Sequence, residues 1–282
     1  LFMISMEFTI DYLKQLALNV CDVINPLIGQ KEASIKSNRG AGGDITMYID
    51  QVAEEVVIQS LKKDKVNCLL ISEEIGEKYI GNKIEANRSQ NTLIVDPLDG
   101  SNNAVRGIPY CSVSIAYAIG NKMNDIIRAV VLDLNTRDIY WAERGKGAFL
   151  NDTKIYVSDL DIRQKCFFEL NLPMKNLMKN LQKLAPLIRR FYRIRIMGST
   201  ALTLCQIAGG SMEAFINLRE SNRLVDVAAG FLILKEAGGK IFSLEGKEIN
   251  KNLSIEVKFP FIACNVKLES FFKTELINKK SN

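Results

Sequence analysis

The sequence predicts a mixed α/β protein, with an antiparallel α+β part first and an alternating α/β part after it. Two observations predict this class. Several short β-rich runs follow one another between residues 68 and 157 with short connections, which favours a largely antiparallel sheet. After residue 164, helical and strand patterns alternate. The chain has 282 residues, 47% of them hydrophobic, so it can bury the core of one large domain or of two lobes.

The N-terminal part of the chain predicts two helices. Apolar residues at helical spacing run over residues 8–24, and Pro26 ends this pattern. The polar, Gly-rich residues 37–43 are expected to form a mobile surface loop. A second helical pattern then extends to Leu61.

The remaining elements form two groups. The predicted strands of the first group are residues 68–71, 92–95, 112–119, 126–132 and 139–142. The second group has a helix from Leu177, a strand over 193–197, a helix over 227–237 and a strand over 240–242. No repeat or Pro/Ser-rich linker interrupts the chain, so we expect at most a division between a lobe of residues 1–157 and a lobe of residues 158–282.

The composition excludes several kinds of active site. The chain has no histidine, which rules out every Ser-His-Asp, Cys-His and His-metal arrangement. Any catalysis must therefore use carboxylates, lysine, hydroxyls, cysteine or metal ions. The net charge of +5 suits anionic small molecules and is far below that of a dedicated nucleic-acid-binding protein.

The six cysteines lie far apart, so no CxxC pair exists for zinc, iron–sulfur or redox chemistry. Their mostly apolar surroundings are typical of reduced core cysteines, which predicts a cytoplasmic protein. No apolar run reaches the roughly 18 to 20 residues that a membrane span needs, so we expect a soluble protein without a membrane partner.

A pair of carboxylates follows the predicted strand 92–95. Asp96 ends this strand and Asp99 lies three residues further on, so both side chains can converge at one sheet edge. The carbonyl of Leu98 lies between them, and Gly100 lets a ligand approach the backbone closely. Hard oxygen ligands of this kind favour Mg²⁺ or Mn²⁺. The alternative is an Asx turn that only joins two elements.

Three further segments carry acids. Glu73 and Glu74 end another short apolar strand, Asp44 and Asp50 lie six residues apart, and Asp226 stands alone in an apolar run at a helix start. Burying a bare carboxylate costs free energy unless something compensates its charge, and a metal ion is one such group. For Asp226 the alternative is a helix N-cap.

These segments, in this order and at these distances, resemble the inositol monophosphatase superfamily. They are Asp44-x-Thr46-x-x-x-Asp50, Ser72-Glu73-Glu74, Asp96-Pro97-Leu98-Asp99-Gly100-Ser101 and Asp226-Val227-Ala228-Ala229-Gly230. The chain looks most like the archaeal branch, which combines fructose-1,6-bisphosphatase and inositol monophosphatase activities. Residues 144–151, Gly198-Ser199 and residues 236–239 are similar as well, so the resemblance covers residues 8–265.

The resemblance implies a layered αβαβα sandwich, a homodimer and a metal centre. Two or three Mg²⁺ ions, with Mn²⁺ as an alternative, would be held by Glu73, Asp96, the Leu98 carbonyl, Asp99 and Asp226. The implied catalytic set is Asp50, Ser101 and Glu73, in which Asp50 and Ser101 orient and deprotonate the attacking water. The amides of Gly100 and Ser101 would hold the phosphate.

The same resemblance implies a set of substrate-binding residues. They are Asp99, Gly100, Ser101, Arg195, Ser199, Thr200, Arg219 and Asp226. Arg219 stands where animal enzymes carry a Glu, and a guanidinium there favours a second anionic group on the substrate, such as another phosphate. Arg195 is expected to reach the substrate, and a solvated basic surface is the alternative for it and for Arg189, Arg190 and Arg193.

The leading hypothesis is a magnesium-dependent phosphatase of small sugar or polyol phosphates, fructose 1,6-bisphosphate or inositol 1-phosphate or both, that uses metal-activated water. One alternative is a phosphatase of 3'-phosphoadenosine 5'-phosphate, although no clear aromatic or extended insertion would grip an adenine. Another is a non-catalytic regulator that binds RNA or a protein partner through its arginines. Against this last alternative stands the complete set of acids.

Overall fold

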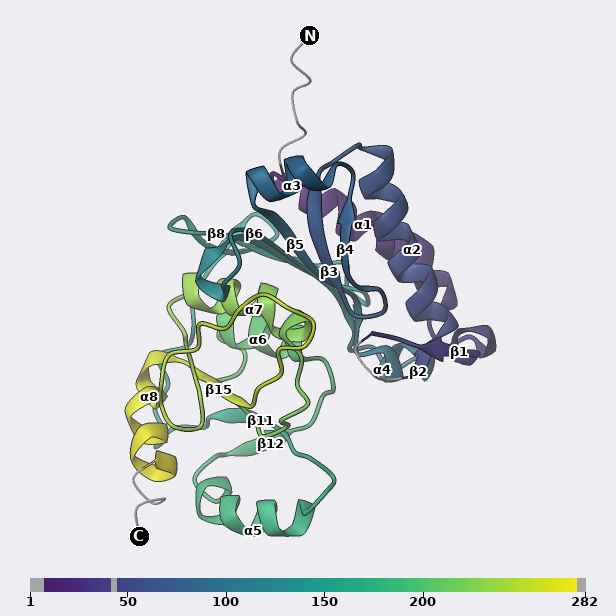
Figure 1. Cartoon of the computed structure of the whole chain (residues 1–282). Coiled ribbons are helices and arrows are strands. Elements are labelled where there is room, and N and C mark those ends of the chain that lie inside the picture. Colours follow the sequence, from purple (N-terminus) through teal and green to yellow (C-terminus); the bar gives the residue numbers. More distant parts are fainter. Residues whose placement is uncertain (1–7, 42–44, 278–282) are drawn as a thin grey trace.

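Two β-sheets and three groups of helices alternate in five layers, in the order αβαβα (Figure 1). The computed structural model describes residues 8–41 and 45–277. Its helices are α1 (Ile10–Ile24), α2 (Tyr48–Lys63), α3 (Lys83–Ser89), α4 (Ser101–Val105), α5 (Leu177–Ile188), α6 (Thr200–Ala208), α7 (Leu224–Glu236) and α8 (Val266–Phe272). Short 3-10 turns lie at η1 (Asn25–Leu27), η2 (Lys31–Ser34) and η3 (Met123–Asp125), and a π-helical turn, η4 (Lys273–Ile277), follows α8.

The strands belong to a hairpin and to the two sheets. They are β1 (Lys36–Arg39), β2 (Ile45–Met47), β3 (Cys68–Ser72), β4 (Gly76–Ile80), β5 (Asn91–Asp99), β6 (Ser112–Ile119), β7 (Ile126–Asp133), β8 (Ile139–Glu143), β9 (Gly147–Leu150), β10 (Thr153–Ile155), β11 (Phe167–Asn171), β12 (Arg193–Arg195), β13 (Ala214–Asn217), β14 (Lys240–Phe242) and β15 (Phe261–Cys264). The larger sheet has the order β10-β9-β8-β7-β6-β5-β3-β4, and the smaller sheet has the order β12-β11-β13-β15-β14.

The larger sheet is antiparallel except for one pair of strands. β3 and β5 run parallel, because β4 and α3 lie between them in the chain and return it to the same end of the sheet. In the smaller sheet, β11 runs parallel to β12 and β13, whereas β15 is antiparallel to both of its neighbours. The carboxyl ends of β3 and β5 therefore lie side by side, where these two strands of the larger sheet end.

Alternating side chains of the strands divide the core among the layers. Leu93 and Val95 of β5 pack in the cluster that α1 and α2 form with the larger sheet, whereas Ile94 faces the layer of α6 and α7. That layer lies between the sheets (Figure 1). In β13, Phe215 belongs to this inner cluster and Ile216 to the outer cluster with α5 and α8. Both sheets are thus covered on two faces.

The predicted fold class is confirmed, and so are the five strands of the first group and the largely antiparallel sheet. The expected loop over residues 37–43 is wrong in part, because Lys36–Arg39 forms β1 and pairs with β2. Gly42, Gly43 and Asp44 lie outside the described residues.

The strand expected over residues 193–197 ends at Arg195. The larger sheet ends with β10 and the smaller one begins with β11, and the division of the chain into two lobes at residue 157 stays a prediction. None of the helices in the described ranges combines the length and the apolar character that crossing a membrane requires.

Candidate active site

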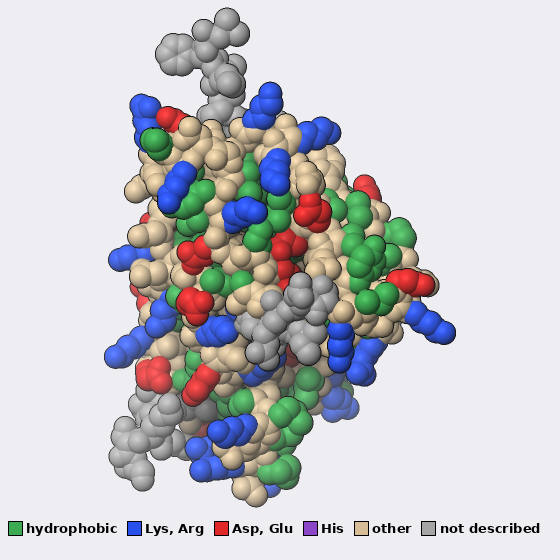
Figure 2. All heavy atoms as spheres, turned by 45° about the vertical axis from the view of Figure 1, so that its right-hand side comes forward, with side chains coloured by type: hydrophobic (Ala, Val, Ile, Leu, Met, Phe, Trp, Pro, Cys, Tyr) green, Lys and Arg blue, Asp and Glu red, His purple; other side chains and the backbone are tan. Residues whose placement is uncertain are grey.

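A cavity of about 820 Å³ opens at the edge where β3 and β5 end. Its wall includes many of the predicted site residues, namely Asp50, Glu73, Asp99, Gly100, Ser101, Ser199, Thr200, Arg219 and Asp226. The space-filling view shows Asp and Glu side chains in a hollow near the middle of one face, with Lys and Arg side chains around it (Figure 2). The predicted ligands Asp96 and Leu98 are buried.

Strand pairing brings acids from distant segments together. Ser72 of β3 lies opposite Val95 of β5, so Glu73 and Asp96 follow at neighbouring positions of the sheet edge. Asp226 comes from the first turn of α7, in the adjoining layer. One carboxylate oxygen from each of Glu73, Asp96 and Asp226 lies within 4.8 Å of the other two.

These three carboxylates suit a metal ion for a reason beyond proximity. Asp96 is 1% exposed, and its Oδ1 accepts a hydrogen bond from the Leu98 amide at 3.1 Å. Within residues 8–41 and 45–277, no donor reaches its buried Oδ2. A buried carboxylate oxygen without a partner is costly, and a cation beside it removes that cost. The set contains only hard oxygen ligands, the type that Mg²⁺ and Mn²⁺ prefer.

Asp99 is held by the N-terminus of α6. Between Asp96 and Asp99, β5 has one residue more than the facing part of β6, and this bulge redirects the strand at the cavity. Asp99 Oδ2 accepts hydrogen bonds from the Ser199 hydroxyl at 2.6 Å and from the Ala201 amide at 2.7 Å. The cavity wall is therefore linked from β5 to α6 through one carboxylate.

Glu169 supports the same segment from behind and was not predicted from the sequence. It lies on β11, is 2% exposed and still reaches the cavity wall. Its carboxylate accepts hydrogen bonds from the Met197 amide at 3.0 Å and from the Thr203 hydroxyl at 2.7 Å. These bonds position the turn that carries Ser199 and Thr200.

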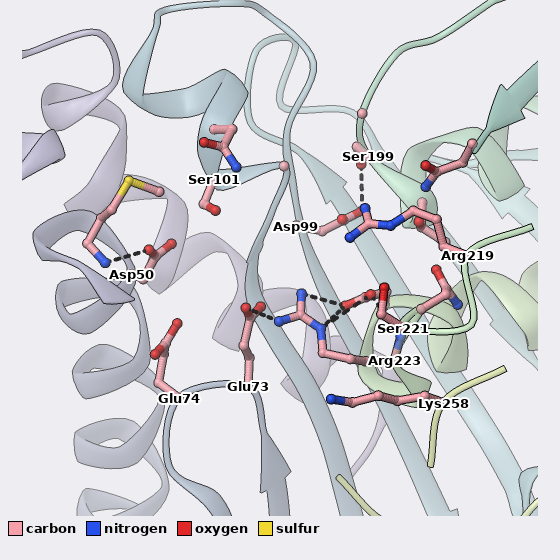
Figure 3. A pocket seen from close by; sticks show the side chains of 18 of the residues that line it. Asp50, Glu73, Glu74, Asp99, Ser101, Ser199, Arg219, Ser221, Arg223 and Lys258 are labelled. Carbon is pink, nitrogen blue, oxygen red and sulfur yellow. Dashed lines mark hydrogen bonds and ion pairs between the residues drawn. The ribbon is translucent and has the colours of Figure 1, made fainter. Parts of the chain in front are cut away.

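Asp50 and Ser101 enter the cavity from two helices (Figure 3). Asp50 lies in the first turn of α2, where its Oδ2 accepts a hydrogen bond from the Met47 amide at 3.0 Å. Ser101 begins α4, directly after Gly100. Gly100 has a φ of 88°, and a Cβ at this position would lie 3.0 Å from the Tyr110 carbonyl oxygen, so this turn requires glycine.

Glu74 ties the β1–β2 hairpin to the cavity. Its carboxylate accepts a hydrogen bond from the Thr46 hydroxyl, and its carbonyl accepts one from the Ala41 amide at 2.9 Å. Lys36 of β1 and Met47 of β2 line the cavity in consequence. The hairpin is thus one part of the wall.

Burial raises the pKa values of the central carboxylates. It raises the pKa of Asp50 to about 7 and that of Asp99 to about 7. The pKa of Glu73 rises to about 8, because burial outweighs its attraction to Arg223. Burial, followed by repulsion from Glu73, raises the pKa of Asp96 well above its ordinary value. Acids that are this hard to ionise gain most from a neighbouring cation.

Cationic side chains occupy another part of the wall. Arg219 is exposed on the loop between β13 and α7, and its amide donates to Asn217 Oδ1 at 3.1 Å. Arg223 donates hydrogen bonds to both Glu73 and Asp226 (Figure 3). Arg223 was not predicted from the sequence, because its three-residue spacing signals only the contact with Asp226, whereas Glu73 lies 150 positions away in the chain.

The predicted substrate ligand Arg195 lies away from this wall. Its guanidinium is 4.9 Å from the centre of the Phe167 ring, and its Nη1 donates to the Ile194 carbonyl at 3.0 Å. The neighbouring arginines Arg189, Arg190 and Arg193 are exposed. The role of Arg195 stays a prediction.

Comparisons with known proteins agree with this architecture. A solved structure of an inositol monophosphatase–fructose 1,6-bisphosphatase superposes with a TM-score of 0.83 at 29% identity, covering 96% of this chain and 100% of that chain. A fructose-1,6-bisphosphatase/inositol-1-monophosphatase of Methanothermobacter thermautotrophicus is 34% identical over 268 residues, which cover 92% of this chain and 94% of that protein.

A longer relative is a bifunctional NADP phosphatase/NAD kinase of Methanococcus maripaludis. It is 35% identical over 280 residues, which cover 89% of this chain and 47% of that protein, so this chain spans about half of its length. The model of the inositol monophosphatase family matches residues 6–279. With that match over nearly the whole chain, this protein belongs to the inositol monophosphatase family.

Proposed function

We propose that this chain is a magnesium-dependent phosphatase that hydrolyses small sugar or polyol phosphate monoesters, namely fructose 1,6-bisphosphate, inositol 1-phosphate or both. Its family and the names of its relatives support a phosphoric monoester hydrolase. The observation that carries the proposal is the meeting of Glu73, Asp96 and Asp226 within 4.8 Å beside the cavity.

In the proposed site, Glu73, Asp96 and Asp226 hold Mg²⁺, with Asp99 and the Leu98 carbonyl as further ligands. When bound, the metal supplies Lewis-acid stabilisation of the phosphate oxygens and lowers the pKa of a bound water. Activation of water by a metal ion suits this chain, because it has no histidine to act as a general base.

The other predicted residues act on the water and the phosphate. Asp50 accepts the proton of the attacking water at Oδ1, since its Oδ2 is engaged by the Met47 amide. Its pKa of about 7, raised by burial, makes it a stronger base than an ordinary carboxylate. The Ser101 hydroxyl orients this water, and the amides of Gly100 and Ser101 donate to the phosphate.

Substrate selection falls to the exposed part of the wall. Arg219, which lines the cavity, pairs with a second anionic group of the substrate by charge-assisted hydrogen bonds. Thr200, at the start of α6, offers its hydroxyl to the substrate, whereas the Ser199 hydroxyl donates to Asp99 and acts on the substrate through that carboxylate. Arg195 would have to leave the Phe167 ring to reach the substrate as predicted, and Arg195→Met should then raise KM more than Arg193→Met does; equal KM values would exclude this role.

The deciding experiment is phosphate release from fructose 1,6-bisphosphate and inositol 1-phosphate, with Mg²⁺ or with EDTA. Asp96→Asn serves as the inactive control. We expect release that requires Mg²⁺ and is lost in the variant. Turnover in EDTA equal to that in Mg²⁺ would contradict the proposal, and so would an active Asp96→Asn protein.

A second candidate is removal of the 2'-phosphate from NADP. The relative from Methanococcus maripaludis carries NADP phosphatase in its name. The cavity of about 820 Å³ and its cations Lys36, Arg219, Arg223 and Lys258 also suit a larger, polyanionic ligand. NADP and 3'-phosphoadenosine 5'-phosphate therefore belong in the same assay. A kcat/KM for either that exceeds those of the sugar phosphates would move the assignment to adenosine-bearing substrates.

We also propose that the protein is cytoplasmic and forms a homodimer. All six cysteines are free and buried, which supports a reducing, cytoplasmic environment. We expect a homodimer, which light scattering would detect as twice the mass of one chain. An RNA-binding regulator would instead give a salt-sensitive gel shift that Asp96→Asn leaves unchanged.

A further inference from the structure

Arg223 contacts two of the three carboxylates proposed to hold the metal. Its Nη1 donates to Glu73 Oε1, and its Nη2 lies 3.1 Å from Asp226 Oδ1. Its Nε donates to the same Asp226 oxygen at 3.2 Å. The guanidinium thus bridges the end of β3 and the first turn of α7 (Figure 3).

The charges around this bridge explain why a cation is needed there. Glu73, Asp96 and Asp226 bring their oxygens within 4.8 Å of one another, and each side chain is largely buried. Three like charges this close repel strongly where water screens them little. The guanidinium supplies a positive charge to two of them through charge-assisted hydrogen bonds.

From these contacts we infer that Arg223 is a built-in counter-ion of the metal site, which Mg²⁺ must displace from Glu73 and Asp226 when it binds. The inference rests on the proposed function, because it takes these acids as metal ligands. It makes Arg223 a positioning residue that sets metal affinity: the guanidinium stabilises the metal-free protein and competes with the cation for the same oxygens.

The backbone around Arg223 allows this exchange without unfolding the helix. The Arg223 amide donates to Asp226 Oδ2 at 3.2 Å, so Asp226 keeps a partner when the guanidinium leaves. The Leu224 amide donates to the Val257 carbonyl at 3.0 Å and fixes the start of α7. The Arg223 side chain itself lines the cavity and can turn into it. Only side-chain torsions need to change.

The test measures metal binding rather than turnover. Mn²⁺ is titrated into the full chain, free Mn²⁺ is followed by electron paramagnetic resonance, and Mg²⁺ affinity is obtained by competition. We expect Arg223→Met to bind both ions about tenfold tighter than the wild type, because the competing hydrogen bonds are gone. Arg223→Lys keeps the charge but lacks the planar fork, so its metal affinity should lie between those of the wild type and Arg223→Met.

Lys258→Met is the matched control for net charge. Lys258 lines the same cavity and pairs through its backbone with Arg223, so the variant removes one positive charge nearby. We expect it to tighten binding by only about twofold, since solvent and salt screen this exposed side chain.

The outcomes separate the inference from the proposed function. The inference alone is overturned if folded Arg223→Met binds the metal no more tightly than the wild type does. The same holds if it binds no more tightly than Lys258→Met does. Failure of both the wild type and Arg223→Met to bind either ion overturns the proposed function and the inference with it.

A measurement on the wild type covers the case in which Arg223→Met does not fold. The Nε–H resonance of Arg223, identified with Arg223→Lys, should shift and exchange faster with water when Mg²⁺ saturates the site. A resonance that stays unchanged at saturation overturns the inference.

Discussion

The strand-end wall of the cavity and the loop wall before α7 differ in burial and in charge. Glu73, Asp96 and Asp99 lie at the ends of paired strands, in a register set by buried neighbours. The loop wall carries Arg219 and Arg223, and Arg219 is exposed. Rigid elements hold groups that must meet within a few ångströms, whereas exposed loops can vary without loss of the fold. We therefore expect damage to the first wall to abolish catalysis, and changes at the exposed Arg219 of the second wall to alter selectivity.

The largest effect is expected for Asp96→Asn, at the strand ends directly behind this wall. The amide keeps the shape but loses the charge, so turnover with Mg²⁺ should fall by about a thousandfold. The metal-free variant should be at least as stable as the wild type, because it no longer buries an unpaired carboxylate oxygen. Steady-state kinetics and urea denaturation measure the two quantities.

Asp152→Asn is the control for this change, since Asp152 is exposed in the turn between β9 and β10. It should leave turnover and stability unaltered. Near wild-type, Mg²⁺-dependent turnover in Asp96→Asn would show that the strand-end wall does not carry the chemistry.

The loop wall should respond through selectivity. Arg219→Glu replaces the cation by an anion, which should lower kcat/KM for fructose 1,6-bisphosphate about tenfold more than for inositol 1-phosphate. Arg88→Glu, which reverses an exposed charge on α3, should leave kcat/KM for both substrates unchanged. Equal losses on both substrates would mean that Arg219 does not recognise the second phosphate.

The pKa values of the central acids predict how the metal-free protein responds to pH. Burial raises the pKa of Asp50 to about 7 and that of Glu73 to about 8, whereas the same carboxyl groups have pKa values of about 4 in the unfolded chain. At pH values between the unfolded and the folded pKa, the folded state binds more protons than the unfolded state. The free energy of unfolding therefore falls as the pH rises from about 5 to 8.

Mg²⁺ should oppose this fall, because it binds the ionised carboxylates, and its stabilising effect should be larger at pH 8 than at pH 5. Asp50→Asn keeps an acceptor for the Met47 amide and should flatten the metal-free slope in part. A metal-free protein that gains stability between pH 5 and 8 would contradict the burial of these acids.

How far the sequence predicts this molecule depends on the local signals that bound each element, such as Gly238 and Gly239 before the strand over 240–242. The strands over 112–119 and 240–242 were predicted with the observed bounds. β13 and β15, with four residues each and buried throughout, were not predicted, because a short apolar run without alternation cannot be told from part of a buried helix. The parallel pairing of β3 and β5 also depends on tertiary packing.

The same limit applies to the site. Glu73 and Asp96 stand out because acids that follow apolar strands are unusual in a sequence. Arg223 and Glu169 do not, because their partners are set by the tertiary fold, and Glu73 is 150 positions away from Arg223 in the chain. Motifs could identify the acids, whereas the groups that balance or position them required the structure.

The smallest effect is expected where the β5 end meets the helical layer. Ser199→Ala removes the hydroxyl that donates to Asp99 and caps α6, so the free energy of unfolding should fall by about 1 kcal/mol. Turnover should fall about fivefold, because Asp99 loses the Ser199 hydroxyl and keeps only backbone donors such as the Ala201 amide. Thr9→Ala is the matched control, because Thr9 caps α1 far from the cavity. Thr9→Ala should lower the free energy of unfolding by a similar amount and leave turnover unchanged. If both variants lost the same fraction of turnover, the effect of Ser199 would be one of helix capping alone, and Asp99 would not depend on it.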